Sequence, residues 1–184
     1  MAKSRAQIYD ELLVLKCQQG DREAFAELVE RWQKRLWQYA FQVSGSQTAA
    51  WDILQETWYG VVKGINKLKD TAVFPRWVFR ILNHKCVDWQ RRQHLQSQLS
   101  DKLVNQTQDE SDEKLNCAER AENLRQAVEK LSPESRAILT LRYQAGFNMA
   151  QIAGILDIAE GTVKSRLHRT LKKLREMMGA DSDV

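Results

Sequence analysis

Cationic and hydroxyl side chains near the end of the chain have the chemistry needed to recognise nucleic acid. Over 160–178, apolar residues recur at helical spacing, which predicts an amphipathic helix whose buried face carries Val163, Leu167, Leu171, Leu174 and Met178. The candidate contacts lie on the opposite face or flank it, and they are Thr162, Lys164, Ser165, Arg166, His168, Arg169 and Lys172. Arginine and lysine can donate to guanine edges or to phosphates, and hydroxyls can bond to either. We therefore expect this face to contact DNA.

A short predicted helix over 149–156 and a tight turn over 157–159 precede this basic helix. A helix-turn-helix of this kind places its second helix in the major groove of duplex DNA. The positive end of that helix dipole also favours phosphate. A solvated basic face on an ordinary amphipathic helix is the alternative interpretation. The short helix and the turn favour DNA binding.

A second group of cations lies between residues 67 and 92 and is opposed there by only Asp70 and Asp88. Such a patch suits single-stranded DNA, because cations can follow its phosphates while its bases are unpaired. The candidate contacts are Lys67, Lys69, Arg76, Arg80, His84, Trp89, Arg91 and Arg92. Trp89 either stacks on a base or packs in the core, whereas Phe74 and Trp77 are expected to be core residues.

An acidic strip on a predicted helix over 47–65 is a candidate protein-docking surface. Asp52, Gln55 and Glu56 are spaced to share one exposed face beside Tyr59. The buried face of the same helix is expected to carry Ala50, Leu54, Trp58, Val61 and Ile65. A solvated acidic face is the alternative, and the helix taken by itself favours that alternative.

The elements that carry these residues are all expected to be α-helices. Apolar residues recur at helical spacing, and no run alternates as a strand does. Helices are predicted over 6–19, 22–43, 47–65, 75–93, 118–131, 134–144, 149–156 and 160–178, with a loop over 67–73. Between them, 96–116 is rich in Gln, Ser, Asn and acids, which is typical of a linker. We expect domains over 1–95 and 117–178, a linker over 96–116 and a tail over 179–184.

The second block resembles region 4 of sigma factors of the extracytoplasmic-function (ECF) type. The resemblance rests on 131–143, on Gln151 to Ala153 and on Gly161 to Arg169. It implies that this block reads the promoter element about 35 bases upstream and docks on the flap of the RNA polymerase β subunit. It assigns DNA contacts to Lys164, Ser165, His168 and Arg169, with Thr162 and Arg166 added. The chain departs from the family pattern at Gln151, Asp157 and Ala159, and Ala159 removes a helix N-cap.

The first block resembles sigma region 2. The matching segments, in order, are Gly20–Phe25, 50–56, 74–77 and 88–92. The resemblance implies that Asp52, Gln55 and Glu56 bind the coiled coil of the polymerase β′ subunit. It also implies that the segment at 67–74 captures a flipped base of the melted −10 element. Trp51 and His84 depart from the family pattern, where an acid and an asparagine are usual.

Composition narrows the function further. The chain has 184 residues and a formal net charge of +4. Its three cysteines are widely spaced, and this spacing argues against a disulfide framework or a zinc site. The residues show no phosphate-binding loop, metal cluster or nucleophile–base pair, so we expect a non-enzyme without cofactors. No run is apolar enough for a signal peptide or a membrane span, so we expect a cytoplasmic protein.

The expected partners are bacterial RNA polymerase core and promoter DNA, with an anti-sigma factor as a further candidate that the resemblance implies. Two alternatives remain from the residues alone. One is a helix-turn-helix regulator that acts without polymerase docking, and the other is a helical adaptor that binds only protein. The first would bind duplex DNA without polymerase, and the second would be unaffected by neutralising Lys164 and Arg169.

Overall fold

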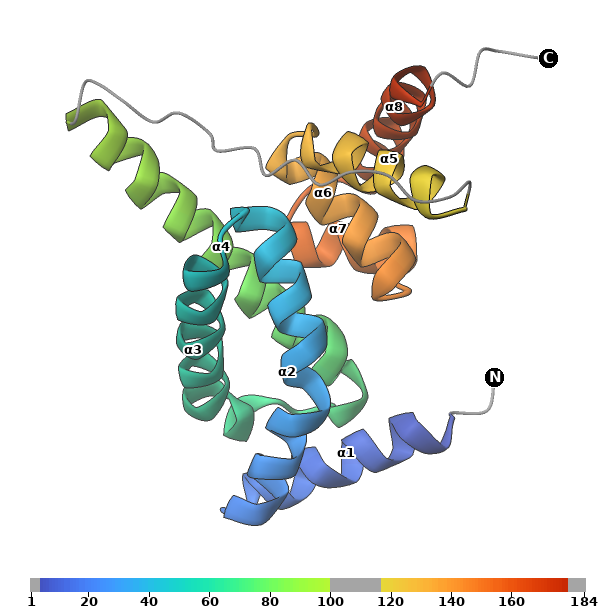
Figure 1. Ribbon diagram of the computed structural model, residues 1–184. Helices are drawn as coiled ribbons and strands as arrows, with labels where there is room; N and C mark the ends of the chain where they lie inside the picture. The colour runs from blue at the N-terminus through green and yellow to red at the C-terminus, as the bar shows by residue number, and fades with distance from the viewer. Residues whose placement is uncertain (1–3, 100–116, 179–184) are drawn as a thin grey trace.

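The computed structural model describes residues 4–99 and 117–178, and every regular element within these ranges is helical (Figure 1). The N-terminal block contains four α-helices: α1 (Arg5–Gln18), α2 (Arg22–Ser44), α3 (Gln47–Gly64) and α4 (Phe74–Leu99). Short 3₁₀ turns, η1 (Ile65–Lys67) and η2 (Thr71–Val73), join α3 to α4. The C-terminal block contains α5 (Cys117–Glu129), α6 (Pro133–Leu139), a π-helical turn η3 (Thr140–Gln144), α7 (Met149–Leu156) and α8 (Glu160–Met177).

Side-chain caps fix where the N-terminal helices begin and end. Asp21 accepts hydrogen bonds from the backbone N–H groups of Glu23 and Ala24, both at 3.0 Å, and so starts α2. Gly45 ends the same helix in the left-handed region at φ +71°, which a side chain would strain. This sharp reversal sends the chain directly into α3, which packs against α2.

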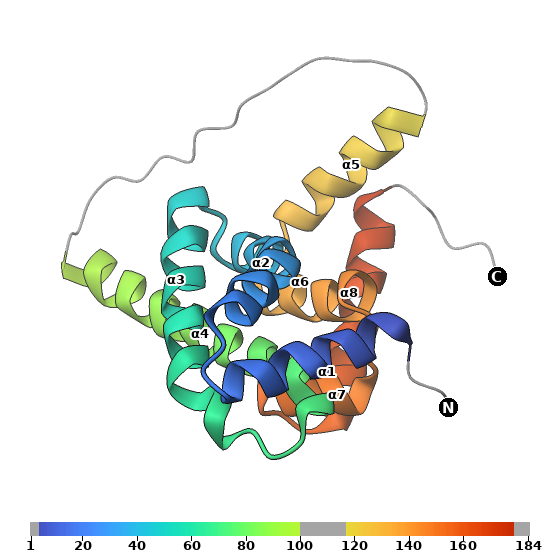
Figure 2. The same ribbon diagram turned by 90° about the horizontal axis from the view of Figure 1, so that it is seen from below.

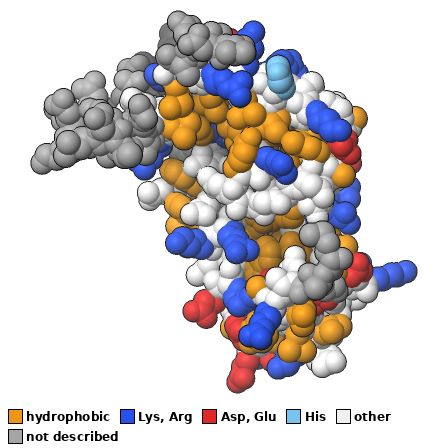
Figure 3. Space-filling view, turned by 90° about the vertical axis from the view of Figure 1, so that its right-hand side faces the viewer, with side chains coloured by type: hydrophobic (Ala, Val, Ile, Leu, Met, Phe, Trp, Pro, Cys, Tyr) orange, Lys and Arg blue, Asp and Glu red, His pale blue; other side chains and the backbone are white. Residues whose placement is uncertain are grey.

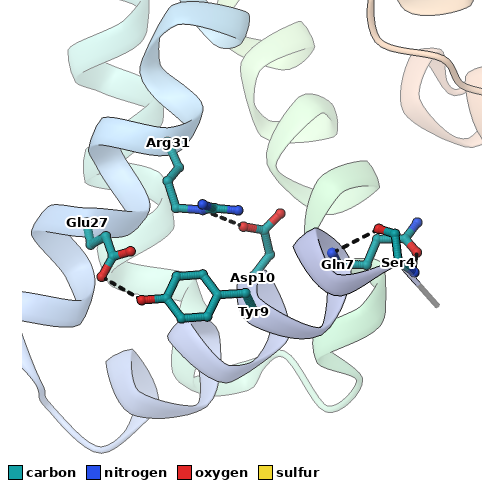
Figure 4. A network of polar contacts seen from close by, with 6 residues as sticks. All are labelled: Ser4, Gln7, Tyr9, Asp10, Glu27 and Arg31. Carbon is teal, nitrogen blue, oxygen red and sulfur yellow. Dashed lines mark hydrogen bonds and ion pairs between the residues drawn. The ribbon is translucent and has the colours of Figure 1, made fainter.

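Polar contacts hold α1 across the first half of α2 (Figure 4). Tyr9 donates from its hydroxyl to Glu27 Oε2 at 3.1 Å, and Arg31 donates from Nε to Asp10 Oδ1 at 2.8 Å. The Arg31 guanidinium also lies 5.1 Å from the centre of the Tyr9 ring. Beneath these contacts, Leu13 and Val14 of α1 are buried in the core. The contact between α1 and α2 is therefore polar at its edge and apolar where the helices meet.

Glycines allow α3 and α4 to approach closely. A Cβ on Gly64 would lie 2.8 Å from Cζ2 of Trp77, and one on Gly60 would lie 3.0 Å from Cγ2 of Ile81. Side chains of α4 therefore pack directly against the backbone of both glycines. Trp77 is half-buried there and contacts the Phe74 ring at 6.1 Å between centres, in agreement with the core role expected for both residues.

One hydrophobic core joins the two blocks. The α6 helix packs against α2, and α7 packs against α4 (Figures 1 and 2). At the centre of this contact, the rings of Phe79 on α4 and Phe147 of the second block meet edge to face at 5.3 Å. Tyr39, which is fully buried, donates from its hydroxyl to Asn83 Oδ1 at 2.8 Å.

The structure confirms the all-α fold and differs from the sequence predictions at several helix ends. The α4 helix continues to Leu99, past the predicted end at 93 and the predicted domain boundary at 95, because no glycine or proline interrupts 76–99. The segment at 67–73 is partly wound into η1 and η2 rather than being a plain loop. The helix predicted over 134–144 ends in the π turn η3, where Ala145 N–H donates to Thr140 O at 2.9 Å. The rest of the predicted linker and the predicted tail lie outside the described residues.

Candidate nucleic-acid interface

The helix-turn-helix predicted from the sequence is present at α7 and α8. Asn148 starts α7 with a reciprocal cap in which Asn148 Oδ1 accepts from Gln151 N–H, and Gln151 Oε1 accepts from Asn148 N–H, both at 2.9 Å. Gln151 therefore performs this capping with an amide side chain. Asp157 ends α7 in the left-handed region at φ +57°. Ala159 begins α8 without a side-chain cap, as its residue type predicts, at a cost of about 1 kcal/mol.

The two faces of α8 follow the expected periodicity with one exception. Val163, Leu167 and Leu174 are buried, and Leu171 is half-buried against the core. Met178 was predicted on the same buried face but is 40% exposed, because it is the residue that ends α8 beyond its last packed turn. Thr170 is buried instead and donates to Arg166 O at 2.8 Å.

The candidate DNA contacts of α8 lie together on its outer side. Lys164, Ser165, His168, Arg169 and Lys172 are exposed, whereas Thr162 and Arg166 are half-buried. Lys164 pairs with Glu160 at 2.8 Å, and Lys172 pairs with Glu176 at 4.0 Å. Exposed pairs of this kind contribute at most about 1 kcal/mol, so a phosphate can replace the carboxylate. The helix therefore offers cations that are only loosely held by its own acids.

A cleft beside α8 adds residues that the sequence interpretation did not include. Its lining combines three cations and three hydroxyls with one acid, from α8, α6 and the N-cap of α6, and consists of Ser132, Glu134, Ser135, Arg166, Arg169, Thr170 and Lys173. Since the Thr170 hydroxyl donates to Arg166 O, Ser135 Oγ donates to Thr170 Oγ1 at 3.0 Å, and Ser132 Oγ donates to Ser135 Oγ at 3.2 Å. Lys173 follows Arg166 and Arg169 at helical spacing, which was the signal available in the sequence. The three cations outnumber the single acid, Glu134, and together with the hydroxyls they suit a phosphate group.

The cations of the second candidate group are spread along α4 and the turns before it. Arg76, Arg80, His84, Arg91 and Arg92 are exposed on α4, and Lys67 and Lys69 are exposed on the turns. Gln18 holds these turns in place, because its side-chain amide donates to Ile65 O and to Leu68 O, both at 2.8 Å. Trp89 is half-buried and packs against the core, which leaves part of its ring accessible.

The C-terminal block contacts this α4 surface. Arg80 Nη2 lies 3.8 Å from Asp157 Oδ1, at the end of α7. A Cβ on Gly154 would lie 4.0 Å from Cδ of Arg76. Two of the candidate single-strand contacts are thus beside α7 in this structure. Over the face of the molecule shown in Figure 3, Lys and Arg side chains alternate with exposed hydrophobic ones.

The acidic strip on α3 is exposed at its centre and paired at one end. Asp52 and Gln55 are exposed, and Tyr59 is 63% exposed beneath the ammonium of Lys63, 4.1 Å from the ring centre. Lys63 lowers the pKa of the Tyr59 hydroxyl through a hydrogen bond and its charge. Glu56 instead accepts from Arg92 at 3.1 Å and pairs with Lys85 at 3.4 Å. The residues predicted on the inward face of this helix are all buried or half-buried, and the last of them, Ile65, lies in η1 just after α3.

Comparisons with known proteins identify the family to which the chain belongs. Residues 28–95 match the family model for Sigma-70 region 2, and residues 121–174 match that for Sigma-70, region 4. The ECF RNA polymerase sigma factor SigL of Mycobacterium tuberculosis is 34% identical over 142 residues, which cover 76% of this chain and 80% of SigL. The chain belongs to the ECF RNA polymerase sigma factors. It is therefore an RNA polymerase sigma factor, as the sequence motifs predicted, rather than a regulator or an adaptor of another family.

Other relatives of this ECF sigma factor agree with that assignment. SigX of Bacillus subtilis is 28% identical over 163 residues, covering 85% of this chain and 84% of SigX. The structure of CnrH in complex with the cytosolic domain of CnrY has a TM-score of 0.65 and 25% identity, covering 95% of this chain and 99% of CnrH. The sigma factor RpoE from Bartonella quintana, solved with the anti-sigma factor NepR, has a TM-score of 0.68 at 22% identity over 86% of this chain and 98% of RpoE, which supports the fold.

In this ECF sigma factor the region 2 match covers α3 and most of α2 and α4, and the region 4 match covers α6, α7 and most of α5 and α8. Within the described residues, none of the helices of this sigma factor is both long and apolar enough to cross a membrane.

His84 and Cys86, which are close in sequence, lie on different sides of α4, because His84 is exposed and Cys86 is fully buried.

Proposed function

We propose that this sigma factor recognises promoter DNA with two surfaces and docks on RNA polymerase with a third. The block from α5 to α8 reads the −35 element as duplex, and the block from α1 to α4 binds the opened −10 element. Docking on core polymerase presents both surfaces to one promoter. The observation that carries this proposal is the helix-turn-helix at α7 and α8 in the same chain as the exposed strip on α3.

For the −35 element, we assign major-groove contacts to the exposed side of α8. The exposed Lys164, Ser165, His168 and Arg169 support this role, since they combine donors for guanine with donors for phosphate. Thr162, Arg166 and Lys172 flank them and suit backbone contacts. The cleft that Arg166 and Arg169 share with Lys173 would hold a phosphate of the adjoining backbone.

For the −10 element, the cations of α4 and its leading turns would follow the phosphates of the melted strand. Lys67 and Lys69 lie on turns fixed by Gln18, and Arg76, Arg80, His84, Arg91 and Arg92 extend the surface along α4. The half-buried Trp89 has accessible ring surface on which a base could stack. Opening of the duplex is then driven by capture of the single strand and needs no energy source of its own.

For polymerase, we assign docking on the β′ coiled coil to Asp52, Gln55, Glu56 and Tyr59. The exposure of Asp52, Gln55 and Tyr59 supports this assignment. Region 4 would dock on the β flap. We further propose that the protein is not an enzyme, uses no cofactor and works in the cytoplasm, where core polymerase is found. An anti-sigma factor is a candidate inhibitor. The Bartonella RpoE was solved with the anti-sigma factor NepR, and CnrH was solved with the cytosolic domain of CnrY.

Transcription in vitro with bacterial core polymerase and a library of promoters tests the proposal. The expected result is initiation that depends on both core polymerase and this protein, from templates that share −35 and −10 elements. The absence of initiation from every template, together with the absence of binding to core, would contradict the proposed function. Duplex binding without any effect of core polymerase would instead indicate a conventional helix-turn-helix regulator.

A further inference from the structure

A row of exposed apolar side chains runs along the outer face of α3 and passes through Gln55 of the acidic strip. Trp51, Tyr59 and Val62 are 49%, 63% and 54% exposed. With Gln55 between them, these positions follow one another at intervals of four, four and three residues, so they share one side of the helix. The row covers about 16 Å of α3 at about 1.5 Å per residue. Single exposed apolar residues are common, whereas an aligned row of them is typical of a surface that binds a partner.

Trp51 begins this row and also contacts α2, which lies beside α3 (Figure 1). Its ring centre is 5.9 Å from that of Trp37, at an interplanar angle of 44°. The Trp37 ring in turn stacks on Phe41, with 5.2 Å between centres and planes 4° apart. Trp37 and Phe41 are half-buried and pack against the core, so they support the Trp51 ring while about half of it stays in solvent. A ring held in this way loses little conformational entropy when a partner covers it.

The position of Trp51 indicates which partner covers it. Asp52 follows it in the sequence and Gln55 lies one turn further along α3, and both are exposed residues assigned to polymerase docking. A partner that contacts Asp52 and Gln55 therefore also reaches Trp51. The row of side chains suits a partner helix, because the side chains of two helices interlock at intervals of three and four residues. Asp52, beside the row, would pair with a cation on that helix.

We propose that Trp51 is the apolar anchor of polymerase docking, and that Tyr59 and Val62 extend its contact along one helix of the β′ coiled coil. The inference rests on the proposed function for the identity of that partner. In this chain a tryptophan stands where the family pattern has an acid, so docking buries an aromatic ring at a position where a charge is usual. Tryptophan is among the residues that most often dominate the affinity of a protein interface.

Substitutions at position 51 distinguish an apolar anchor from a charged contact. Trp51→Phe keeps an aromatic ring, Trp51→Ala removes it, and Trp51→Glu introduces the acid of the family pattern. About half of the Trp51 side chain is exposed, so all three variants should stay folded, which circular dichroism and chemical denaturation check. Ile8→Ala is the matched control, because Ile8 is an apolar residue of α1 that is 55% exposed and belongs to none of the assigned surfaces.

Titration of the labelled full chain with core polymerase, at low and at high salt, measures the contribution of Trp51. We expect Trp51→Ala and Trp51→Glu to bind core at least about 10-fold more weakly than wild type. Trp51→Phe should lose less than either, and Ile8→Ala should bind as wild type does. The loss in Trp51→Ala should persist at high salt, because salt does not screen the burial of apolar surface. The loss in Asp52→Asn should shrink as salt is raised, because it is a loss of charge.

The outcomes separate the anchor from the proposed function. Equal core affinity for wild type, Trp51→Ala and Trp51→Glu would overturn the inference and leave the proposed function standing, since the chain would still dock on core. A loss in Trp51→Ala that is absent from Trp51→Glu would also overturn it, because position 51 would then act through charge. An equal loss in Ile8→Ala would do the same, because the effect would not be specific to the row on α3. No binding of wild type to core would contradict the proposed function and, with it, the partner named for Trp51.

Discussion

Arg92 Nη2 donates to Glu56 Oε1 at 3.1 Å, which joins the acidic strip of α3 to the cationic surface of α4. Lys85 pairs with the other oxygen of the same carboxylate at 3.4 Å. A residue assigned to polymerase docking is therefore already paired with one assigned to the −10 element. Asp52 and Gln55, which are exposed, are left as the accessible polar groups at the centre of the strip.

This pairing predicts unequal roles for the acidic residues in core binding. Replacing Asp52 and Gln55 together by alanine should weaken binding to core polymerase at least about 10-fold, a loss of about 1.4 kcal/mol. Glu56→Ala should weaken binding less, because its carboxylate is shared with Arg92 and Lys85 in the free protein. Titration of labelled protein with core polymerase measures both effects.

Stability provides the control for this comparison. Both Asp52 and Gln55 are exposed, so the free energy of unfolding of the double variant should stay within about 0.5 kcal/mol of wild type. A larger loss of core affinity in Glu56→Ala than in the double variant would contradict the predicted ranking.

The cleft between α6 and α8 predicts a phosphate contact without base recognition. Lys173→Ala should lower affinity for −35 duplexes about equally for all sequences. It should also reduce the magnitude of the slope of log affinity against log salt by about 0.9, the value for one phosphate. Lys164→Ala with Arg169→Ala should instead change which sequences are preferred. Binding isotherms on matched and scrambled duplexes at several salt concentrations distinguish the two effects. If Lys173→Ala leaves the salt dependence unchanged, the Lys173 ammonium of the wild type does not contact a phosphate.

Local signals in the sequence predicted the helices well, whereas contacts between distant residues left no such signal. The apolar spacing and the turn over 157–159 predicted α7 and α8, because turns and periodicity are local properties, whereas the cap at Asn148 was found only in the structure. The contact of Phe79 with Phe147 joins residues far apart in the chain, and each could equally have packed within its own block. The same reason explains why Ser132 and Ser135 were not recognised beside Arg166, since α6 had to be placed before their cleft existed.

Close packing at Gly64 predicts a strong effect of a single methyl group on stability. In Gly64→Ala, the added Cβ would meet Cζ2 of Trp77 at 2.8 Å, so α4 must shift away from α3. The free energy of unfolding should fall by about 1–3 kcal/mol despite the better helix propensity of alanine. Gly161→Ala is the control, because its Cβ would meet nothing within 4 Å, and it should be neutral or stabilising by up to about 1 kcal/mol. Chemical denaturation of wild type and both variants measures the difference. If Gly64→Ala is as stable as Gly161→Ala, α3 and α4 can move apart at this position without a loss of stability.

The buried Cys86 thiol predicts a loss of stability at alkaline pH. Burial raises the pKa of Cys86 from 9.0 to about 12, so the folded state keeps the thiol protonated after the unfolded chain has ionised. The stabilisation is complete below pH 9, and it is lost as pH rises through the interval from about 9 to about 12. Each pH unit in this interval costs about 1.4 kcal/mol of unfolding free energy.

Cys86→Ala should therefore start from a lower stability at pH 8, because it leaves a small cavity, but lose about 1.4 kcal/mol less than wild type between pH 8 and pH 10. Burial raises the pKa of Tyr39 most, and the charge of Cys86 raises it further; the burial remains in both proteins, so the larger contribution cancels in the comparison. Urea midpoints measured under reducing conditions at each pH give the two curves. Parallel curves for wild type and Cys86→Ala would show that the thiol ionises in the folded protein as readily as in the unfolded chain, against its place in the core beside Tyr39.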